Sequence, residues 1–151
     1  MGANINSQLP FSEIVKVRYS DLDAQGHLYF AKYLIFGDEV LGAYMEQLGL
    51  SIMDPLSAPS LIFTVNIHCD YHNEIAGNSE IAVYVGYGRL GNSSADAVFE
   101  LYNNASGTLL ASGGLTQVFV DPKTRQSMAI PEFYRANIIE QQQALGASYD
   151  Y

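Results

Sequence analysis

A short polar segment places carboxylates, a glycine and a histidine directly before a stretch with helical periodicity. Residues 20–28 read Ser-Asp-Leu-Asp-Ala-Gln-Gly-His-Leu, so Asp21 and Asp23 lie just before the expected helix. A helix N-terminus presents unpaired N–H donors and a partial positive charge, and it can therefore stabilise the oxyanion that develops during acyl transfer. A carboxylate held there can attack a carbonyl carbon or take a proton from water. Such an arrangement can support acyl-transfer chemistry, but taken by itself the pattern favours a helix cap or turn residue as the role of Asp23.

The helix that would supply these donors is predicted from about Tyr29 to Leu48. Apolar and small residues recur there at intervals of three or four, which is the spacing of one helical face. They are Phe30, Tyr33, Gly37, Leu41, Tyr44 and Leu48. Further apolar residues widen this face, so we expect the helix to be deeply buried. Gly49 stands where a left-handed residue commonly ends a helix.

Strand-like alternation of apolar and polar residues occurs on both sides of this helix. The five runs that show it cover residues 13–19, 61–72, 79–88, 94–102 and 108–121. Asn78, Gly91-Asn92 and Gly107 mark the turns between the last four runs. A single sheet cannot shield its own apolar face from water, so we expect the helix to pack across that face. The order of elements therefore predicts an α+β fold with a strongly curved antiparallel sheet around one helix.

The run over residues 61–72 is expected to have two distinct faces. One face consists of Phe63, Val65, Ile67, Cys69 and Tyr71. The other face begins with Thr64 and includes His68 and His72. These histidines and Cys69 resemble a set of metal ligands, but a strand would point Cys69 away from both histidines. Because the sequence has no second ligand cluster, we expect no metal site and no cofactor.

The segment 17–33 carries a resemblance to a known family. It reads Val-Arg-Tyr-Ser-Asp-Leu-Asp-Ala-Gln-Gly-His-Leu-Tyr-Phe-Ala-Lys-Tyr. It resembles the signature of the 4-hydroxybenzoyl-CoA thioesterase-like hotdog family: a strand, an Asp-x-Asp-x-x-Gly-His loop, and an aromatic-rich helix. The order of elements is similar over roughly residues 13–135. The resemblance implies a hotdog fold, with about five strands wrapped around one long helix, and thioester hydrolysis as the activity.

The resemblance also assigns roles to residues of this segment. It implies that Asp23 is the catalytic carboxylate, acting as nucleophile or as general base toward water. Backbone N–H groups near Tyr29 and Phe30 would polarise the thioester oxygen, each contributing about 3 kcal/mol to transition-state stabilisation. His27 would orient Asp23 or bind the acyl group, or would only satisfy a loop carbonyl. Tyr33 on the helix would contact the substrate.

The expected substrate is an acyl-CoA, and the sequence offers few basic residues that could bind the phosphates of its nucleotide. The family places basic residues in the turn between the third and fourth strands and near the end of the last strand, which implies Arg89, Lys123 and Arg125 here. The alternative is ordinary surface charge, since the chain carries 16 acidic and 7 basic residues and a formal net charge of −9. An acyl carrier protein remains an alternative source of the acyl group. Tyr29 and Phe30 favour an aromatic or short-to-medium acyl group.

Composition limits the other possibilities. The 151 residues, of which 48% are hydrophobic, suit one domain with its own core. We expect a loose segment over residues 1–12, one domain over 13–143 and a tail over 144–151, with Pro131 opening a short final helix. The acidic balance argues against nucleic acid as a partner. One cysteine, no signal segment and no long apolar stretch favour a cytoplasmic protein without membrane contact.

Two other functions stay open at this level. A hotdog dehydratase or hydratase would use a catalytic histidine, and His27 is the only histidine near the helix start. A non-catalytic acyl-thioester binder would have no need of Asp23. The resemblance further implies a homodimer or homotetramer, because an open edge strand invites pairing. Residues 58–66 of a partner chain, with Thr64 as a polar candidate, would then line the pocket opposite Asp23.

Overall fold

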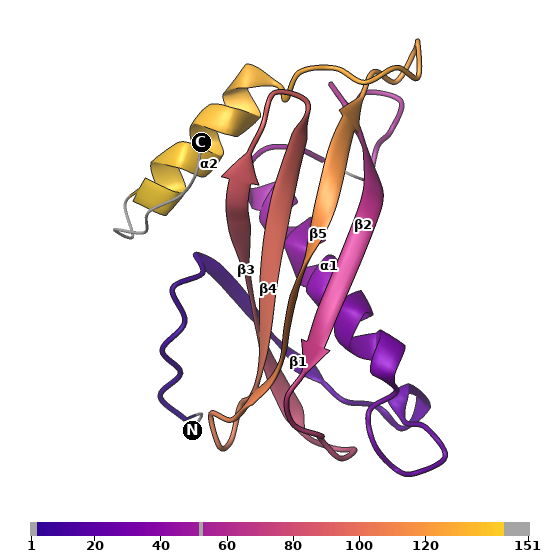
Figure 1. Ribbon diagram of the computed structural model, residues 1–151, viewed down its shortest axis with the longest axis vertical. Helices are drawn as coiled ribbons and strands as arrows, with labels where there is room; N and C mark the ends of the chain where they lie inside the picture. Colours follow the sequence, from indigo (N-terminus) through magenta and orange to yellow (C-terminus); the bar gives the residue numbers. More distant parts are fainter. Residues whose placement is uncertain (1–2, 52, 144–151) are drawn as a thin grey trace.

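Five antiparallel strands form one sheet that curves around a long helix (Figure 1). The computed structural model describes residues 3–51 and 53–143. The elements are β1 (Phe11–Lys16), the 3-10 helix η1 (Tyr19–Asp21), α1 (Phe30–Gln47), β2 (Leu61–Tyr71), β3 (Glu80–Leu90), β4 (Ser94–Asn103), β5 (Leu109–Val120) and α2 (Glu132–Gln143). This arrangement confirms the predicted α+β hotdog fold.

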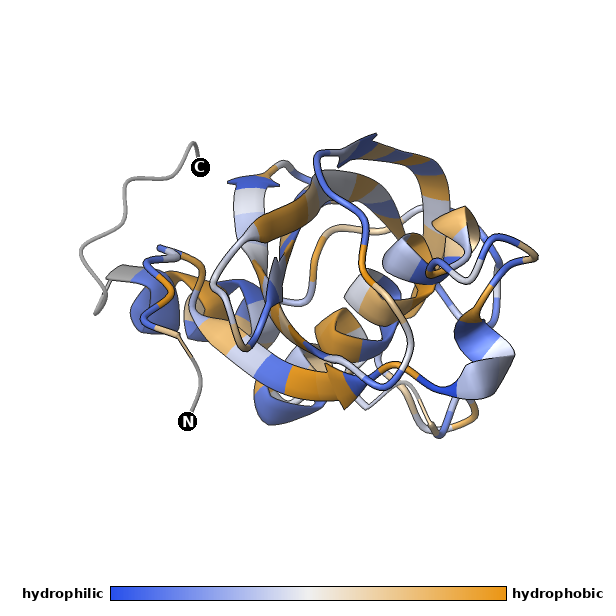
Figure 2. Cartoon of the chain, turned by 90° about the horizontal axis from the view of Figure 1, so that it is seen from below, coloured by the Kyte–Doolittle hydropathy of each residue, from blue (hydrophilic) through white to orange (hydrophobic). Residues whose placement is uncertain are grey.

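The strands lie in the order β1-β3-β4-β5-β2, so β1 and β2 form the two edges of the sheet. Viewed from below, α1 lies inside the curve of the sheet with hydrophobic residues on its ribbon (Figure 2). Gly37 allows this close contact, because a Cβ atom there would lie 2.8 Å from the ring of Phe99 on β4. The helix ends at a left-handed glycine, Gly49, whose φ is 93°. Both glycines lie where the predicted helix requires them.

A β-bulge divides β2 and changes which residues share a face. Thr64 pairs with Gln117 and Asn66 pairs with the next residue of β5, Thr116, so one residue of β2 is extra. Gln117 is buried beneath the sheet, so its partner Thr64 lies on the helix side. The prediction that Phe63 shares a face with Ile67 is therefore wrong. The prediction requires side chains to alternate between the two faces without interruption along β2. The extra residue at the bulge reverses this alternation for the residues that follow it.

The N-terminal segment also differs from the prediction. The sheet begins at Phe11, inside the segment 1–12 that was expected to be loose, and Ala3 N–H donates to the carbonyl of Asn104 (2.8 Å). The predicted strand over residues 13–19 ends at Lys16, and Tyr19 begins η1 with 93% of its surface exposed. The expected tail, 144–151, lies outside the described residues. Within the described residues, no helix is both long and apolar enough to span a membrane.

Gln142 on α2 replaces a missing strand neighbour of β3. The pairing of β1 with β3 stops at Val85, so the peptide groups of Tyr87 have no partner from β1. The buried side-chain amide of Gln142 accepts a hydrogen bond from Tyr87 N–H (2.8 Å) and donates one to the Tyr87 carbonyl (2.9 Å). A helix side chain thus completes the sheet and anchors α2.

We expect Gln142→Ala to lower the free energy of unfolding by about 2–3 kcal/mol, because it leaves a buried N–H and a buried carbonyl without partners. Urea unfolding followed by circular dichroism measures this change. Gln141→Ala, which truncates the same side chain at a partly exposed neighbour, should change the free energy by less than about 0.5 kcal/mol. Equal stability of the two variants would contradict the assigned role.

Candidate active site

The loop before α1 holds Asp23 in a tight turn. The backbone N–H of Asp23 donates to the carbonyl of His27 (2.8 Å), and Gly26, with a φ of 79°, closes the turn with a 3.1 Å bond to the Asp23 carbonyl. Oδ1 of Asp23 accepts the N–H groups of Gln25 (2.8 Å) and His27 (3.2 Å). Asp23 is therefore a turn residue, as one interpretation expected. Its second oxygen, Oδ2, takes no part in these bonds, so the turn orients a carboxylate that keeps one oxygen for chemistry.

Asp21 connects this loop to the helix and is fully buried. Its carboxylate accepts hydrogen bonds from the backbone N–H (2.8 Å) and guanidinium (3.1 and 3.2 Å) of Arg18, and it lies 3.4 Å from Lys32 Nζ on α1. The bonds from the Arg18 side chain are the main cause that lowers the pKa of Asp21. The carbonyl of Asp21 accepts Tyr29 N–H (2.9 Å). Asp21 therefore supports the loop rather than the chemistry.

Asp21→Asn should lower the free energy of unfolding at pH 7 by roughly 2 kcal/mol, because it removes charge-assisted bonds from a buried group. A carboxyl group whose pKa is lowered by folding stabilises the protein above its unfolded pKa of about 3.9, and this contribution disappears as the pH falls through the folded pKa. The difference between wild type and variant should therefore shrink steadily below about pH 4. Chemical denaturation across this pH range measures it, and a difference independent of pH would contradict the assignment.

The first turn of α1 offers two backbone donors to a ligand. The helix has no side-chain cap, and the N–H groups of Phe30 and Ala31 donate to no acceptor among the described residues. The N–H of Tyr29 is occupied by the Asp21 carbonyl, which corrects the expectation that this group faces a substrate. The open donors are thus shifted by one residue from the predicted pair.

A cleft of about 330 Å³ lies beside this helix end. Residues that line it include Asp23, His27, Phe30, Tyr33, Tyr71 and Glu74. The structure therefore brings together four of the predicted site residues, which are Asp23, His27, Phe30 and Tyr33. It adds Tyr71, the last residue of β2, and Glu74 in the following loop. The alternation along β2 had placed Tyr71 on an apolar face, and no local signal connected it with the Asp23 loop.

Polar contacts within the cleft connect the loop, the helix and the sheet. Nε2 of His27 lies 2.9 Å from a carboxylate oxygen of Glu74. The hydroxyl of Tyr71 donates to the carbonyl of Phe30 (2.7 Å), and its ring packs edge-on against Tyr33 with centroids 5.1 Å apart. Burial raises the pKa of Tyr71 to about 12, so its hydroxyl remains a donor at neutral pH. No set of side chains within the described residues is arranged to hold a metal ion.

Four residues predicted to bind substrate lie elsewhere in the chain. Thr64 precedes Tyr71 by seven residues on β2, which corresponds to roughly 23 Å along a strand. Arg89 lies within β3 rather than in a turn, and its guanidinium binds both carboxylate oxygens of Asp96 (2.7 and 3.2 Å). Lys123 and Arg125 lie in the turn after β5. None of these four lines the cleft of Asp23 in the same chain.

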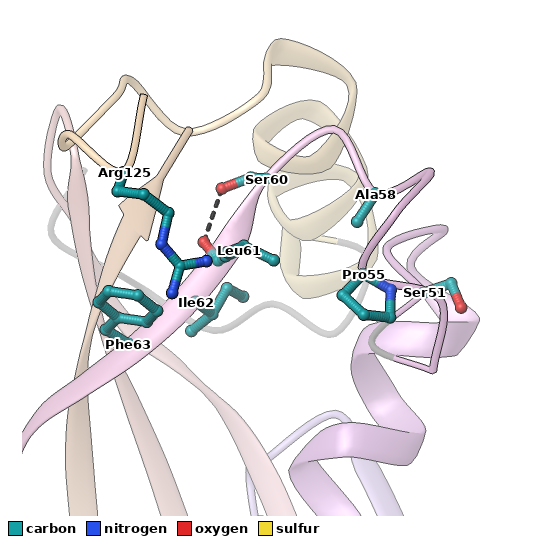
Figure 3. A pocket seen from close by; sticks show the side chains of 8 residues that line it. All are labelled: Ser51, Pro55, Ala58, Ser60, Leu61, Ile62, Phe63 and Arg125. Carbon is teal, nitrogen blue, oxygen red and sulfur yellow. Dashed lines mark hydrogen bonds between the residues drawn. The ribbon is translucent and has the colours of Figure 1, made fainter. Parts of the chain in front are cut away.

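Arg125 lines a second, more apolar cavity of about 210 Å³ at the start of β2. Its guanidinium carbon lies 5.5 Å from the centre of the Phe63 ring, and Figure 3 shows the two stacked beside Ser60 and Ile62. The backbone of Arg125 is left-handed, with a φ of 62°. The turn that holds it is closed by Asp121, whose Oδ1 accepts two backbone N–H groups. The cation is therefore held in place over the cavity.

Comparison with known proteins shows the family of this chain. The family model described as the thioesterase-like superfamily matches residues 17–138. The chain belongs to the thioesterase-like superfamily. This match confirms the expected relationship and supports a thioester hydrolase. No curated protein sequence matches the chain significantly.

Several solved structures resemble the chain over most of its length. The PA5185 protein of Pseudomonas aeruginosa is 27% identical, with a TM-score of 0.79 over 95% of this chain and 96% of that one. The SAV2348 protein of Staphylococcus aureus, solved with CoA, is 22% identical, with a TM-score of 0.82 over 95% and 89%. Slr0204 of Synechocystis, a 1,4-dihydroxy-2-naphthoyl-CoA thioesterase, is 18% identical, with a TM-score of 0.79 over 86% and 96%.

Proposed function

We propose that this protein hydrolyses acyl-CoA thioesters to a free acid and CoA, with Asp23 as the catalytic carboxylate. The observation that supports the proposal most directly is that Asp23 and Phe30 line one cleft, at a helix end where the N–H groups of Phe30 and Ala31 donate to no acceptor among the described residues. A carboxylate and an oxyanion site facing one cleft are what acyl transfer to water requires. Membership of the thioesterase-like superfamily supports the same reaction.

The reaction would proceed at the mouth of the cleft. The thioester carbonyl oxygen accepts hydrogen bonds from the N–H groups of Phe30 and Ala31, which stabilise the negative charge that develops on it. Asp23 either attacks the carbonyl carbon, forming a mixed anhydride that water then hydrolyses, or removes a proton from the attacking water. The carbon–sulfur bond breaks in either route, and CoA leaves as a thiol after protonation. His27, held by Glu74, would orient Asp23 or contact the acyl group.

Binding of the CoA nucleotide would depend on cationic side chains that lie far from Asp23 in the sequence. Arg125 and Lys123 are the best candidates for the nucleotide phosphates, since Arg125 is held over a cavity and has no carboxylate partner among the described residues. Arg89 is less available, because Asp96 already binds its guanidinium. The CoA bound by SAV2348 supports this class of substrate. An acyl carrier protein remains the alternative source of the acyl group.

We expect Arg125→Glu to raise the KM for acyl-CoA roughly tenfold, because it replaces an attractive phosphate contact by a repulsive one. The KM for the matching acyl-N-acetylcysteamine, which lacks the nucleotide, should stay within about twofold. Steady-state thiol release measures both values. Lys16→Glu changes an exposed cation on β1 by the same charge and should leave both KM values unaltered. Equal effects on the two substrates would exclude a phosphate contact.

A homodimer would bring these cations to the cleft. β2 is an edge strand with Phe63, Val65 and Ile67 exposed, which is the kind of edge that pairs with another chain. If two β2 edges pair antiparallel, the start of one strand lies beside the end of the other. The cavity of Arg125 in one chain would then approach the Asp23 cleft of its partner, with residues 58–66 between them. Two such dimers could form a tetramer.

A panel of acyl-CoAs of different chain length, with benzoyl-CoA as an aromatic member, tests the activity directly. Free thiol released above the uncatalysed rate supports hydrolysis. Formation of an α,β-unsaturated thioester without thiol release would instead identify a dehydratase. Binding without turnover of any member would identify a non-catalytic acyl-thioester binder.

A further inference from the structure

Tyr71 connects the edge of the sheet with the first peptide group of α1. It is the last residue of β2 and pairs with the buried Ala111, so its side chain lies on the helix side of the sheet. Its hydroxyl donates to the carbonyl of Phe30 at 2.7 Å. Its ring is supported edge-on by Tyr33, at a centroid distance of 5.1 Å. The hydroxyl is therefore held on one particular carbonyl.

That carbonyl belongs to the same peptide group as the N–H of Ala31. A peptide group is planar, so a hydrogen bond that fixes the carbonyl of Phe30 also fixes the direction of the Ala31 N–H. A hydrogen bond accepted by the carbonyl also polarises the N–H at the other end of the group, because bonded groups in a chain strengthen one another. The Ala31 N–H is one of the two N–H groups at the start of α1 that donate to no acceptor among the described residues.

We infer that Tyr71 is a positioning residue that fixes and polarises the Phe30–Ala31 peptide, whose N–H stabilises the oxyanion. This inference rests on the proposed function. The bonds of Asp21 restrain the helix start from the side of the loop. Tyr71 restrains it from the sheet, at a helix end that has no side-chain cap. An oxyanion donor contributes most when its direction is set before the reaction, and Tyr71 supplies that restraint.

Tyr71→Phe tests the inference, since it removes one hydroxyl and keeps the ring against Tyr33. We expect kcat for benzoyl-CoA or the best substrate of the panel to fall roughly ten- to a hundredfold, as misplacement of a catalytic group does. The KM should stay within about twofold, and the melting temperature within about 4 °C. Tyr84→Phe makes the same deletion on β3, away from the cleft, and should leave kcat unchanged. An unchanged kcat in Tyr71→Phe, or a rise in KM alone, would overturn the inference.

The carbonyl stretch of bound benzoyl-CoA reports on the oxyanion donors directly. Difference infrared spectra would be recorded with Asp23→Asn, with and without Tyr71→Phe. Because Asp23→Asn is expected to turn the thioester over at least about 10²-fold more slowly than wild type, the spectra would be collected before turnover. Loss of the Tyr71 hydroxyl should move the band to higher wavenumber, because the Ala31 N–H then polarises the carbonyl less. An unmoved band would overturn the inference. If wild type hydrolyses no thioester, the proposed function itself fails; an active wild type with an equally active Tyr71→Phe refutes only the role of Tyr71.

Discussion

Asp23→Asn should reduce kcat for the best acyl-CoA by about 10²- to 10⁴-fold, the range that a positioned carboxylate contributes as a general base. The amide keeps the shape of the side chain, and its oxygen can still accept the N–H groups of Gln25 and His27. The turn should therefore persist, and the KM should stay close to that of wild type. Thiol release under steady-state conditions gives both constants.

The choice of control makes this result specific to one carboxylate. Asp70→Asn makes the same change on an exposed residue of β2 and should retain full kcat. Asp21→Asn, two residues away, should affect stability first, because Asp21 binds Arg18 and Lys32 and does not line the Asp23 cleft. Full activity of Asp23→Asn would rule out the proposed mechanism.

A single turnover in water labelled with ¹⁸O separates the two roles of Asp23. A nucleophilic carboxylate forms an anhydride, and its hydrolysis can leave the label in the Asp23 side chain. A general base directs water to the thioester, so the label enters only the acid product. Mass spectrometry of the tryptic peptide and of the product locates the label, and label in the Asp23 side chain identifies the nucleophilic route.

Val65→Lys should convert the proposed dimer to monomers and should also abolish the activity. Val65 lies at the bulge of β2, with 60% of its surface exposed, near the middle of the edge that we expect to pair. A two-fold interface would bring two lysine cations together and desolvate them, which costs several kcal/mol and raises the dimer Kd at least about a thousandfold. Sedimentation at micromolar concentration, with the activity measured in parallel, checks both effects.

The other edge of the sheet provides a matched control for this variant. Ile14 on β1 is 52% exposed, and Ile14→Lys adds the same charge to the opposite edge strand. It should leave both the oligomeric state and the activity unaltered. A dimer that persists in Val65→Lys, or a fully active monomer, would contradict the proposal that residues of a partner chain complete the cleft.

Much of this architecture was accessible from local patterns. The helix period over residues 29–48 and the alternation in the later strands correspond to α1 and β2–β5 within a few residues. The turn glycines Gly49 and Gly107 have φ values of 93° and 75°, as their positions required. These features depend on neighbouring residues, and a periodic apolar pattern has few ways to bury itself.

Some features of the site depend on residues that are neighbours in the sequence, and others depend on contacts between distant strands. The order of Asp21, Asp23 and His27 before a helix start is local, and two of these residues, Asp23 and His27, line the cleft beside that helix start. The bulge of β2, which turns Thr64 toward the helix side, depends on its pairing with β5. The ion pair that occupies Arg89 depends on the register between β3 and β4. No alternation within one strand predicts either of them.

The loop of Asp21 and Asp23 and the end of β2 meet at the start of α1, and they show the same difference between local and long-range effects. The sequence by itself determined that a carboxylate, Asp23, precedes a helix N-terminus. Tertiary structure decided which amides stay open there: the carbonyl of Asp21 occupies the N–H of Tyr29, and Tyr71 reaches the carbonyl of Phe30 from 41 positions away in the chain. Hydrogen bonds between such distant residues depend on how the sheet curves around α1, and that curvature arises only when all five strands pair.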